Sequence, residues 1–236
     1  MEADTPLYQK IHDAIRNRVA SGELRAGVML PSEAEIGRSF GASQGTARKA
    51  LSALERAGIL ERRQGKGTFV ATTTTESELF HFFRLRNPDG SPALPELSRE
   101  NLKRRRATAA EKSAFELPDL THVFEIRRDR QIAGTIRIRE NIALPVPLFP
   151  GLDARGSLPN TLYVLYQDQF GLAIVRADET IAPTSASPQD AVAFGVAEGT
   201  PLLRVDRRAM GISGQVIELR RSLYLTGDLG YAVSLS

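Results

Sequence analysis

Cysteine is absent from the 236 residues of this chain, which excludes disulfide bonds, thiolate zinc sites, iron–sulfur clusters and cysteine nucleophiles. No uninterrupted apolar stretch approaches the roughly 20 residues that a helix needs to cross a bilayer. The chain opens with the polar segment Met-Glu-Ala-Asp-Thr-Pro, which is not typical of a signal peptide. We therefore expect a cytoplasmic protein with no membrane partner.

Histidine is scarce, and its three copies, His12, His81 and His122, lie far apart. They form neither the HxH nor the HExxH pattern of metal sites. The segment Gly65-Lys66-Gly67-Thr68 resembles part of a phosphate loop, but it lies between two predicted strands, whereas a P-loop joins a strand to a helix. We expect no metal ion and no cofactor.

The segment Gly41-Ala42-Ser43-Gln44-Gly45 matches the G-x-S-x-G motif of serine hydrolases. In those enzymes the motif follows a strand. Here it follows a predicted helix, which starts with a capping box from Ser32 to Glu35 and ends near Phe40. We therefore interpret Ser43 as the N-cap of another helix rather than as a nucleophile, and we expect no enzyme.

Positive charge is concentrated in residues 1–70, which carry 11 Lys and Arg against 8 Asp and Glu. The rest of the chain carries 20 of each sign, so the whole net charge of +3 lies in the first part. A small basic unit joined to a larger neutral one indicates a polyanion binder coupled to another function.

The order of elements in this basic part predicts a winged helix-turn-helix. Apolar spacing predicts helices over 6–21, 32–40 and 43–57, and glycines at the turn predict a β-hairpin over 59–70. The solvent side of the third helix carries polar and basic residues near its start, where a recognition helix meets DNA. We therefore predict DNA binding by this domain.

Residues 71–78 contain four consecutive threonines and predict a linker between domains at 1–70 and 79–236. The second domain mixes strands with short helices. We expect strands at 123–126, 135–139, 202–205, 216–225 and 231–235, and helices at 109–115, 161–170 and 188–194. The basic run Lys103-Arg104-Arg105-Arg106 is interpreted as a solvated strand end.

A weak internal repeat relates two parts of this second domain. The first copy contains Ala114-Phe115, Thr121 and Arg128, and the second contains Ala193-Phe194, Thr200 and Arg207 at the same spacing. We call the constant separation from Ala114 to Ala193 the repeat offset. The similarity is either coincidental or the mark of a pseudo-symmetric α+β domain with an antiparallel sheet.

The first domain resembles the DNA-binding domain of the GntR family of bacterial transcription regulators. The residues that carry the resemblance span nearly all of 6–70: Pro6-Leu7-Tyr8, Ser21-Gly22-Glu23-Leu24, Leu30-Pro31-Ser32-Glu33, Phe40-Gly41-Ala42-Ser43, Thr46-Ala47-Arg48, Gly58-Ile59-Leu60 and Arg63-Gln64-Gly65-Lys66-Gly67-Thr68-Phe69-Val70. The second domain resembles the UTRA effector domain of the HutC subfamily, for example at Leu148-Phe149-Pro150-Gly151-Leu152 and Ser222-Leu223-Tyr224.

The resemblance implies an α+β protein with a winged helix-turn-helix and a chorismate-lyase-like UTRA domain built on an antiparallel sheet. It also implies a homodimer that binds a palindromic operator, usually as a repressor, and a small metabolite that changes the affinity for DNA. The positions that match the operator contacts of the family are Ser32, Glu33, Ala34, Ser43, Gln44, Thr46, Arg48, Gly65, Lys66 and Gly67. Two of them depart from the family, since many relatives have arginine in place of Ala34 and of Gln44.

The same resemblance implies an effector pocket. Arg128 and Arg130 match an Arg-x-Arg that binds an anion, and the other matching positions are Glu140, Thr161, Tyr163, Glu218 and Tyr224. Segment 93–97 departs from the serine-containing loop of some phosphate-binding members, so the effector is either a sugar phosphate or a carboxylate. Two alternatives to a sensor are a chorismate-lyase-like enzyme attached to a DNA-binding domain and a second domain that only dimerises.

Overall fold

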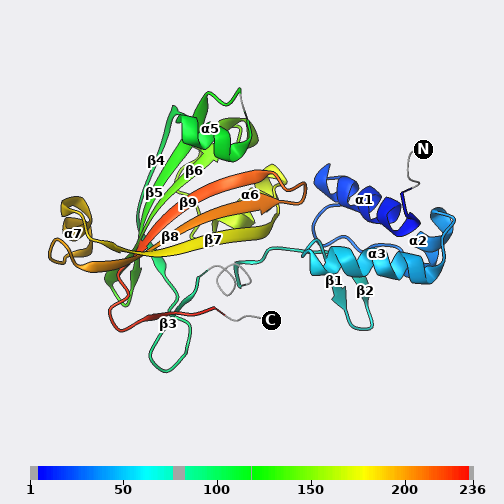
Figure 1. Cartoon of the computed structure of the whole chain (residues 1–236), viewed down its shortest axis with the longest axis horizontal. Helices are drawn as coiled ribbons and strands as arrows, with labels where there is room; N and C mark the ends of the chain where they lie inside the picture. The colour runs from blue at the N-terminus through cyan, green and yellow to red at the C-terminus, as the bar shows by residue number, and fades with distance from the viewer. Residues whose placement is uncertain (1–4, 77–82, 118, 234–236) are drawn as a thin grey trace. The chain divides into compact units, whose positions relative to one another are not determined.

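The computed structural model describes residues 5–76, 83–117 and 119–233 (Figure 1). His81 and residues 77 and 78 of the predicted linker lie outside them. The chain divides into two compact units. The first is Met1–Thr73 with Tyr166–Arg176 and Met210–Gln215, and the second is Thr74–Leu165, Ala177–Ala209 and Val216–Ser236.

The first unit contains the predicted winged helix-turn-helix. Its elements are α1 (Leu7–Ala20), α2 (Glu33–Ser39), α3 (Gln44–Arg56), β1 (Leu60–Arg63) and β2 (Gly67–Val70). The apolar positions that recur at helical spacing form one core between the helices and the hairpin. The buried core residues are Ile11, Ile15, Val19, Leu30, Ile36, Ala47, Ala50, Leu51, Leu54, Ile59, Leu60 and Val70.

Side-chain caps fix where α2 and α3 begin, as the sequence predicted. The Ser32 hydroxyl accepts a hydrogen bond from the backbone N of Glu35 at 3.3 Å, and the Glu35 carboxylate accepts from the backbone N of Ser32 at 2.8 Å. Ser43 caps α3 by accepting from the backbone N of Thr46 at 3.1 Å. These bonds satisfy amide groups that the first helical turn leaves without partners, and they confirm that Ser43 is a cap.

The wing is an antiparallel hairpin in which Leu60 lies opposite Val70. Its turn depends on Gly65 and Gly67, whose φ angles of 71° and 124° suit glycine. Met29, which precedes α2, forms an isolated antiparallel bridge to Phe69 and so joins the hairpin at one residue.

Gly37 makes the close approach of α2 to the turn possible. A β-carbon at this buried position would lie 2.9 Å from the carbonyl oxygen of Ala42 and 3.2 Å from the carbonyl group of Ser43. We expect Gly37→Ala to lower the free energy of unfolding by about 1–3 kcal/mol, because overpacking moves backbone atoms here. Urea denaturation followed by circular dichroism measures this loss.

Gly45→Ala is the matched control, because a β-carbon at Gly45 would meet its nearest atom, the Ser43 hydroxyl, at an ordinary 3.7 Å. A helical position favours alanine over glycine, so this variant gains stability or keeps it. Equal urea midpoints for Gly37→Ala and Gly45→Ala would contradict the packing argument.

Most residues of a six-stranded sheet, in the order β4-β5-β6-β9-β8-β7, belong to the second unit (Figure 1). The pairs β4–β5, β5–β6 and β6–β9 are antiparallel. The strands are β4 (Glu96–Arg106), β5 (His122–Ile132), β6 (Thr135–Pro145), β7 (Ile174–Ser185), β8 (Pro201–Gly211) and β9 (Val216–Tyr224). The helices are α5 (Ala109–Phe115), α6 (Leu162–Phe170) and α7 (Pro188–Phe194), with 3-10 turns at Val146–Leu148 and Leu152–Ala154.

These bounds confirm the three predicted helices and four of the five predicted strands. Of the expected strand at 231–235, Tyr231 lies in a strand and Ala232 and Val233 do not, while residues 234 and 235 lie outside the described part of the chain. β10 contains only Gly230–Tyr231, because its partner β3 (Leu85–Arg86) is two residues long. The sequence reading also missed β7, whose residues are mostly polar or half-exposed.

The internal repeat is confirmed as a structural duplication. The strand order places β4-β5-β6 and β7-β8-β9 symmetrically about the β6–β9 pair. The backbone N of Ala107 donates to the carbonyl of Thr121 at 3.0 Å, and at the repeat offset Ala186 donates to Thr200 at 2.8 Å. The same offset relates the helix N-caps Thr108 and Ser187, so each half repeats its cap and its strand connection.

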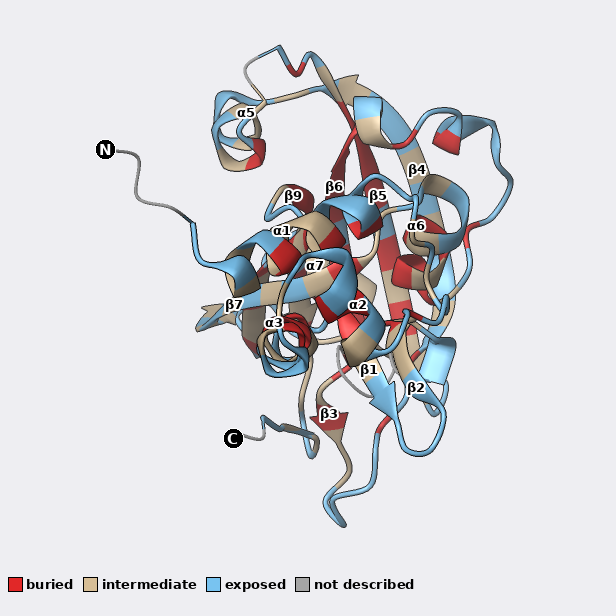
Figure 2. Cartoon of the chain, turned by 90° about the vertical axis from the view of Figure 1, so that its right-hand side faces the viewer, coloured by how far each residue is buried: buried red, intermediate tan, exposed pale blue. Residues whose placement is uncertain are grey.

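Burial is concentrated in the central strands, as Figure 2 shows for β5 and β6. Most of the buried residues there are apolar, but the sheet also buries charged side chains. A buried charge costs free energy unless it is paired and hydrogen-bonded. The partners of those charges therefore define the most informative part of this unit.

Candidate functional site

The first candidate site is the surface where α2, α3 and the wing present polar side chains. Among the predicted DNA contacts, the exposed residues are Ser32, Ser43, Gln44, Arg48, Gly65, Lys66 and Gly67, and the half-buried ones are Glu33, Ala34 and Thr46. Exposed basic groups at the start of a recognition helix and on a wing suit contact with base edges and phosphates.

Glu33 joins the start of α2 to the start of α3. Its carboxylate accepts from Arg48 Nε at 2.8 Å and from the Gln44 amide at 3.4 Å. The other carboxylate oxygen accepts from Arg62 Nη2 of the wing at 3.3 Å. The structure thus brings three predicted contacts together and adds Arg62, a hairpin residue that the predicted set left out.

The wing tip stands apart from this cluster. Lys66 is exposed on the turn between β1 and β2, and its backbone N donates to the carbonyl of Arg63 at 2.9 Å. Ser43 and Thr46 remain engaged in the cap of α3, since their hydroxyl oxygens lie 2.9 Å apart. Lys66 is therefore placed to meet a polyanion by itself, while Gln44 and Arg48 act beside Glu33.

The second candidate site is a buried polar cluster on the sheet of the second unit. All seven predicted effector residues are at most 4% exposed: Arg128, Arg130, Glu140, Thr161, Tyr163, Glu218 and Tyr224. Arg128 and Arg130 point to the same side of β5 because they are two residues apart on a strand. Such a set can recognise an anion and hydroxyl or amino groups once they reach it.

Arg128 ties β5 to β4 and to the loop before α6. Its Nε donates to Glu100 at 2.7 Å, and its two Nη atoms donate to the carbonyls of Asn160 and Pro159 at 3.1 and 2.6 Å. The other Glu100 oxygen accepts from the backbone N of Leu158 at 2.9 Å. Every nitrogen of this guanidinium therefore has a partner in the structure.

Arg130 belongs to a chain of ion pairs deeper in the sheet. It donates to Glu140 at 2.7 Å, and the second oxygen of Glu140 accepts from Arg220 at 3.0 Å. Arg220 holds Glu218 through two bonds of 2.8 Å, and Glu218 accepts from the Tyr163 hydroxyl at 3.0 Å. The alternating signs compensate one another without access to water.

The electrostatics of this chain keep its groups in defined protonation states. Burial alone would raise the pKa of Glu140, but the charges of Arg130 and Arg220 outweigh it and lower that pKa to about 2. Burial and the neighbouring Glu218 raise the pKa of Tyr163 above its ordinary value. Glu140 is therefore a permanent anion at neutral pH, and Tyr163 remains a hydrogen-bond donor.

A second arginine–glutamate pair repeats the first at the repeat offset. Arg207 Nε donates to Glu179 at 2.7 Å, just as Arg128 donates to Glu100. Glu179 also accepts from the Tyr231 hydroxyl at 3.0 Å and lies 3.2 Å from Arg84 Nε. The duplication has therefore copied a buried ion pair as well as the backbone.

The sequence predicted Arg128, Arg130, Glu140 and Glu218 but not the other charged and polar groups that pair with them. Glu100, Asn160, Glu179, Arg207 and Arg220 were not among the predicted site residues. The repeat offered one signal, because the same offset carries Arg128 to Arg207 and Glu100 to Glu179. Asp129, which lies between Arg128 and Arg130 in the sequence, accepts from Arg139 at 3.1 Å instead of pairing with either of them.

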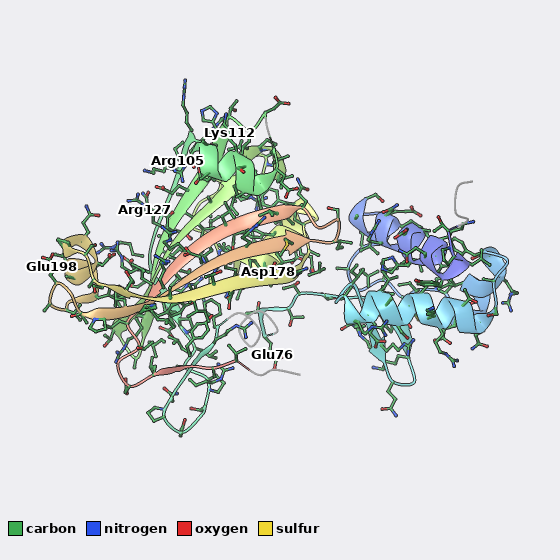
Figure 3. All side chains as sticks on the ribbon, in the orientation of Figure 1. Glu76, Arg105, Lys112, Arg127, Asp178 and Glu198 are labelled. Atoms are coloured by element: carbon green, nitrogen blue, oxygen red, sulfur yellow. The ribbon has the colours of Figure 1, made fainter. Side chains whose placement is uncertain are left out.

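The basic run on β4 is part of a separate ion-pair cluster near α5, where Figure 3 labels Arg105, Lys112 and Arg127. Lys103 and Arg105 each approach the buried Glu125 to 3.0 Å, and Arg105 also donates to Glu111 of α5 at 2.6 and 2.8 Å. The prediction of a solvated strand end is therefore wrong for Arg105, which joins β4 to α5.

Within the described residues, no group of three or more His, Asp or Glu side chains is arranged to hold a metal ion. Over the same part of the chain, no helix is long and apolar enough to cross a membrane.

Comparison with known proteins gives the family of both parts of the chain. Residues 7–70 match the gntR family of bacterial regulatory proteins, and residues 95–228 match the UTRA domain. The mannosyl-D-glycerate transport/metabolism system repressor MngR of Escherichia coli is 26% identical, with 97% of this chain and 95% of the relative covered. The repressor NagR of Bacillus subtilis is also 26% identical, with coverage of 94% and 92%.

A solved structure supports the fold of the second unit. The ligand-binding domain of a GntR-family transcriptional regulator from Bordetella bronchiseptica superposes with a TM-score of 0.60 and 34% identity, over 66% of this chain and 98% of that one. These relatives are regulators of transcription rather than enzymes. The chain therefore belongs to the GntR family of DNA-binding transcriptional regulators, and it carries the UTRA domain that its resemblance to the HutC subfamily predicted.

Proposed function

We propose that this protein is a homodimeric repressor that a small anionic metabolite releases from a palindromic operator. Residues 1–70 bind the DNA, residues 71–78 link the domains, and residues 79–236 bind the effector and dimerise. The observation that carries the proposal is the pair of guanidiniums on β5, Arg128 and Arg130, buried in a UTRA domain in the same polar cluster as Tyr163 and Glu218.

The DNA-binding part of the proposal is supported by the exposed surface on the first unit. Gln44 and Arg48 lie on the first turns of α3, and Lys66 lies on the wing. A helix of this kind enters the major groove, and a lysine at a glycine-flanked tip suits a minor groove. Two copies related by a two-fold axis would read an inverted repeat.

The effector part is supported by the chemistry of the buried cluster. Two adjacent guanidiniums favour a carboxylate or a phosphate, while Thr161, Glu140 and Glu218 offer oxygen atoms to hydroxyl or amino groups and Tyr163 and Tyr224 offer aromatic faces. The Escherichia coli relative is named for a mannosyl-D-glycerate system, and a glycerate carries a carboxylate. A sugar phosphate or a sugar carboxylate is therefore the effector class that we propose.

One experiment tests the whole proposal. The purified protein is used to select binding sites from a random DNA pool, and the recovered DNA is then titrated with the protein in the presence of sugar phosphates and sugar carboxylates. We expect inverted-repeat sites, and at least one metabolite that dissociates the complex and raises the melting temperature of the protein. Recovery of direct repeats would contradict the palindromic operator. If no metabolite changed DNA binding or the melting temperature, that result would contradict the effector role and favour a second domain that only dimerises.

Gln44 is expected to read adenine in this operator. Glutamine pairs with N6 and N7 of adenine, whereas the arginine of many relatives pairs with O6 and N7 of guanine. Gln44→Arg should therefore shift the preference at one operator position from adenine to guanine, by about 1–3 kcal/mol per half-site. Selection from the same random pool with both proteins measures the shift, and identical half-site sequences would mean that Gln44 reads no base.

A further inference from the structure

The buried cluster that Arg128, Arg130 and Arg220 form with their carboxylate partners is already neutral. Three buried guanidiniums, Arg128, Arg130 and Arg220, face three carboxylates, Glu100, Glu140 and Glu218. An effector anion added to this set would leave an uncompensated negative charge in the interior, which is strongly unfavourable. Binding of an anion therefore requires that one of the three carboxylates leaves its guanidinium.

Glu100 differs from the other two carboxylates in its access to the surface. The side chain of Glu100 is 12% exposed, whereas those of Glu140 and Glu218 are 1% and 0% exposed. Glu100 also lines a groove of about 510 Å³, which residues 97–102 of β4 form with Asp153 and residues 155–157. The groove gives the Glu100 carboxylate a solvent-accessible space to move into when it leaves the Arg128 guanidinium.

The repeated pair supplies an internal comparison. Glu179 holds Arg207 as Glu100 holds Arg128, but its second oxygen also accepts from Tyr231 and lies beside Arg84. The second oxygen of Glu100 instead accepts from a neutral backbone amide, that of Leu158. Glu179 is thus held by two cations and a hydroxyl, whereas Glu100 is held by one cation and an amide.

We propose that Glu100 occupies the place of the effector's anion on Arg128, and that the incoming anion displaces it into the groove beside β4. This inference rests on the proposed function, because it assumes an anionic effector at Arg128 and Arg130. The exchange keeps the buried charge constant, since one anion leaves as another arrives. Glu100 is a specificity-determining residue: it selects ligands whose anion binds a guanidinium better than a carboxylate side chain does.

The exchange also changes the loop before α6. Glu100 holds the backbone N of Leu158, and Arg128 holds the carbonyls of Pro159 and Asn160. When an anion binds Arg128 and the Glu100 side chain moves into the groove, the backbone N of Leu158 loses its hydrogen-bond acceptor. The carbonyls of Pro159 and Asn160 then compete with the anion for hydrogen bonds from the Arg128 guanidinium. Residues 158–160 are therefore the segment in which effector binding first alters the backbone.

Inorganic phosphate is the probe for this inference, titrated calorimetrically into the full-length protein. Glu100→Gln removes the competing charge and leaves the buried cluster with one excess positive charge, so phosphate should bind at least about tenfold more tightly than to the wild type. Glu111→Gln is the matched control, because it removes a carboxylate from Arg105 in the separate cluster near α5, and it should leave phosphate affinity at the wild-type value. The double variant Glu100→Gln/Arg128→Met should lose the gain, since both charges are gone.

The outcomes separate the inference from the function on which it rests. Phosphate affinity that Glu100→Gln leaves unchanged, or that Glu111→Gln raises equally, overturns the role of Glu100. If Glu100→Gln fails to fold, Glu100→Asp keeps the charge on a shorter side chain and should still raise the affinity; no increase overturns the inference. Metabolite-induced release of DNA that survives in Glu100→Gln/Arg128→Met contradicts instead the proposed effector site.

Discussion

Arg130→Ala is expected to lower the free energy of unfolding of the second unit by about 3–5 kcal/mol. The side chain is 1% exposed and holds Glu140, whose own side chain is also 1% exposed. It further donates to the side chain and the carbonyl of Asn160 at 2.5 and 2.9 Å. Truncation leaves Glu140 and Arg220 to share a network that has lost one cation, and a buried charge without full compensation is costly.

A paired replacement is the control for this loss. Arg130→Met/Glu140→Leu removes both charges together and leaves Arg220 with its two bonds to Glu218. Because a buried ion pair replaced by apolar side chains is often neutral in stability, the double variant should recover most of the loss. Urea denaturation of both variants measures the difference. A double variant as unstable as Arg130→Ala would show that the hydrogen bonds to Asn160, not the charge balance, stabilise this region.

The winged helix-turn-helix was predictable in detail because its signals are local. Ser32 and Glu35 lie three residues apart, and Gly65 and Gly67 sit within one turn, so each motif specifies its own backbone. The apolar spacing of α1 and α3 then fixes which faces meet in the core. The ion pairs of Glu33 escaped prediction, since its partner Arg62 lies 29 residues away on the hairpin.

The buried cluster was only half predictable for the same reason. Arg128 and Arg130 share a face of β5 by the alternation of a strand, which the sequence reveals. Their partners depend on strand pairing and on a loop: Glu100 comes from β4, and Asn160 from the segment before α6. Local patterns do not specify such partners. The repeat offset nevertheless relates Glu100 to Glu179 and Arg128 to Arg207, so the sequence shows that both residue types recur together.

In both candidate sites, a carboxylate side chain is paired with the guanidinium that the proposed ligand would bind. Glu33 holds Arg48 on the DNA-binding surface, much as Glu100 holds Arg128 in the second unit. The Arg48 side chain is 60% exposed, so its ion pair is weak in water and is exchanged easily. Glu33 therefore orients Arg48 at the start of α3 without keeping it from DNA.

Arg48→Ala is accordingly expected to weaken operator binding without unfolding the domain. An arginine that reads guanine contributes about 1–3 kcal/mol, and a dimer places two copies on the operator, so the total loss is about 2–6 kcal/mol. Lys66→Ala should weaken binding to all DNA sequences equally. It should also make the salt dependence of binding shallower, because a contact with the DNA phosphates or the minor groove is lost.

Arg56→Ala is the matched control for this prediction, since Arg56 is an exposed arginine in the last turn of the same helix. It removes the same charge from α3 at the end that does not enter the groove, so its operator affinity should stay near the wild-type value. Fluorescence anisotropy with selected and scrambled DNA at two salt concentrations measures all three variants. Equal losses for Arg48→Ala and Arg56→Ala would mean that α3 contributes only its overall charge, and that the start of this helix does not read the operator.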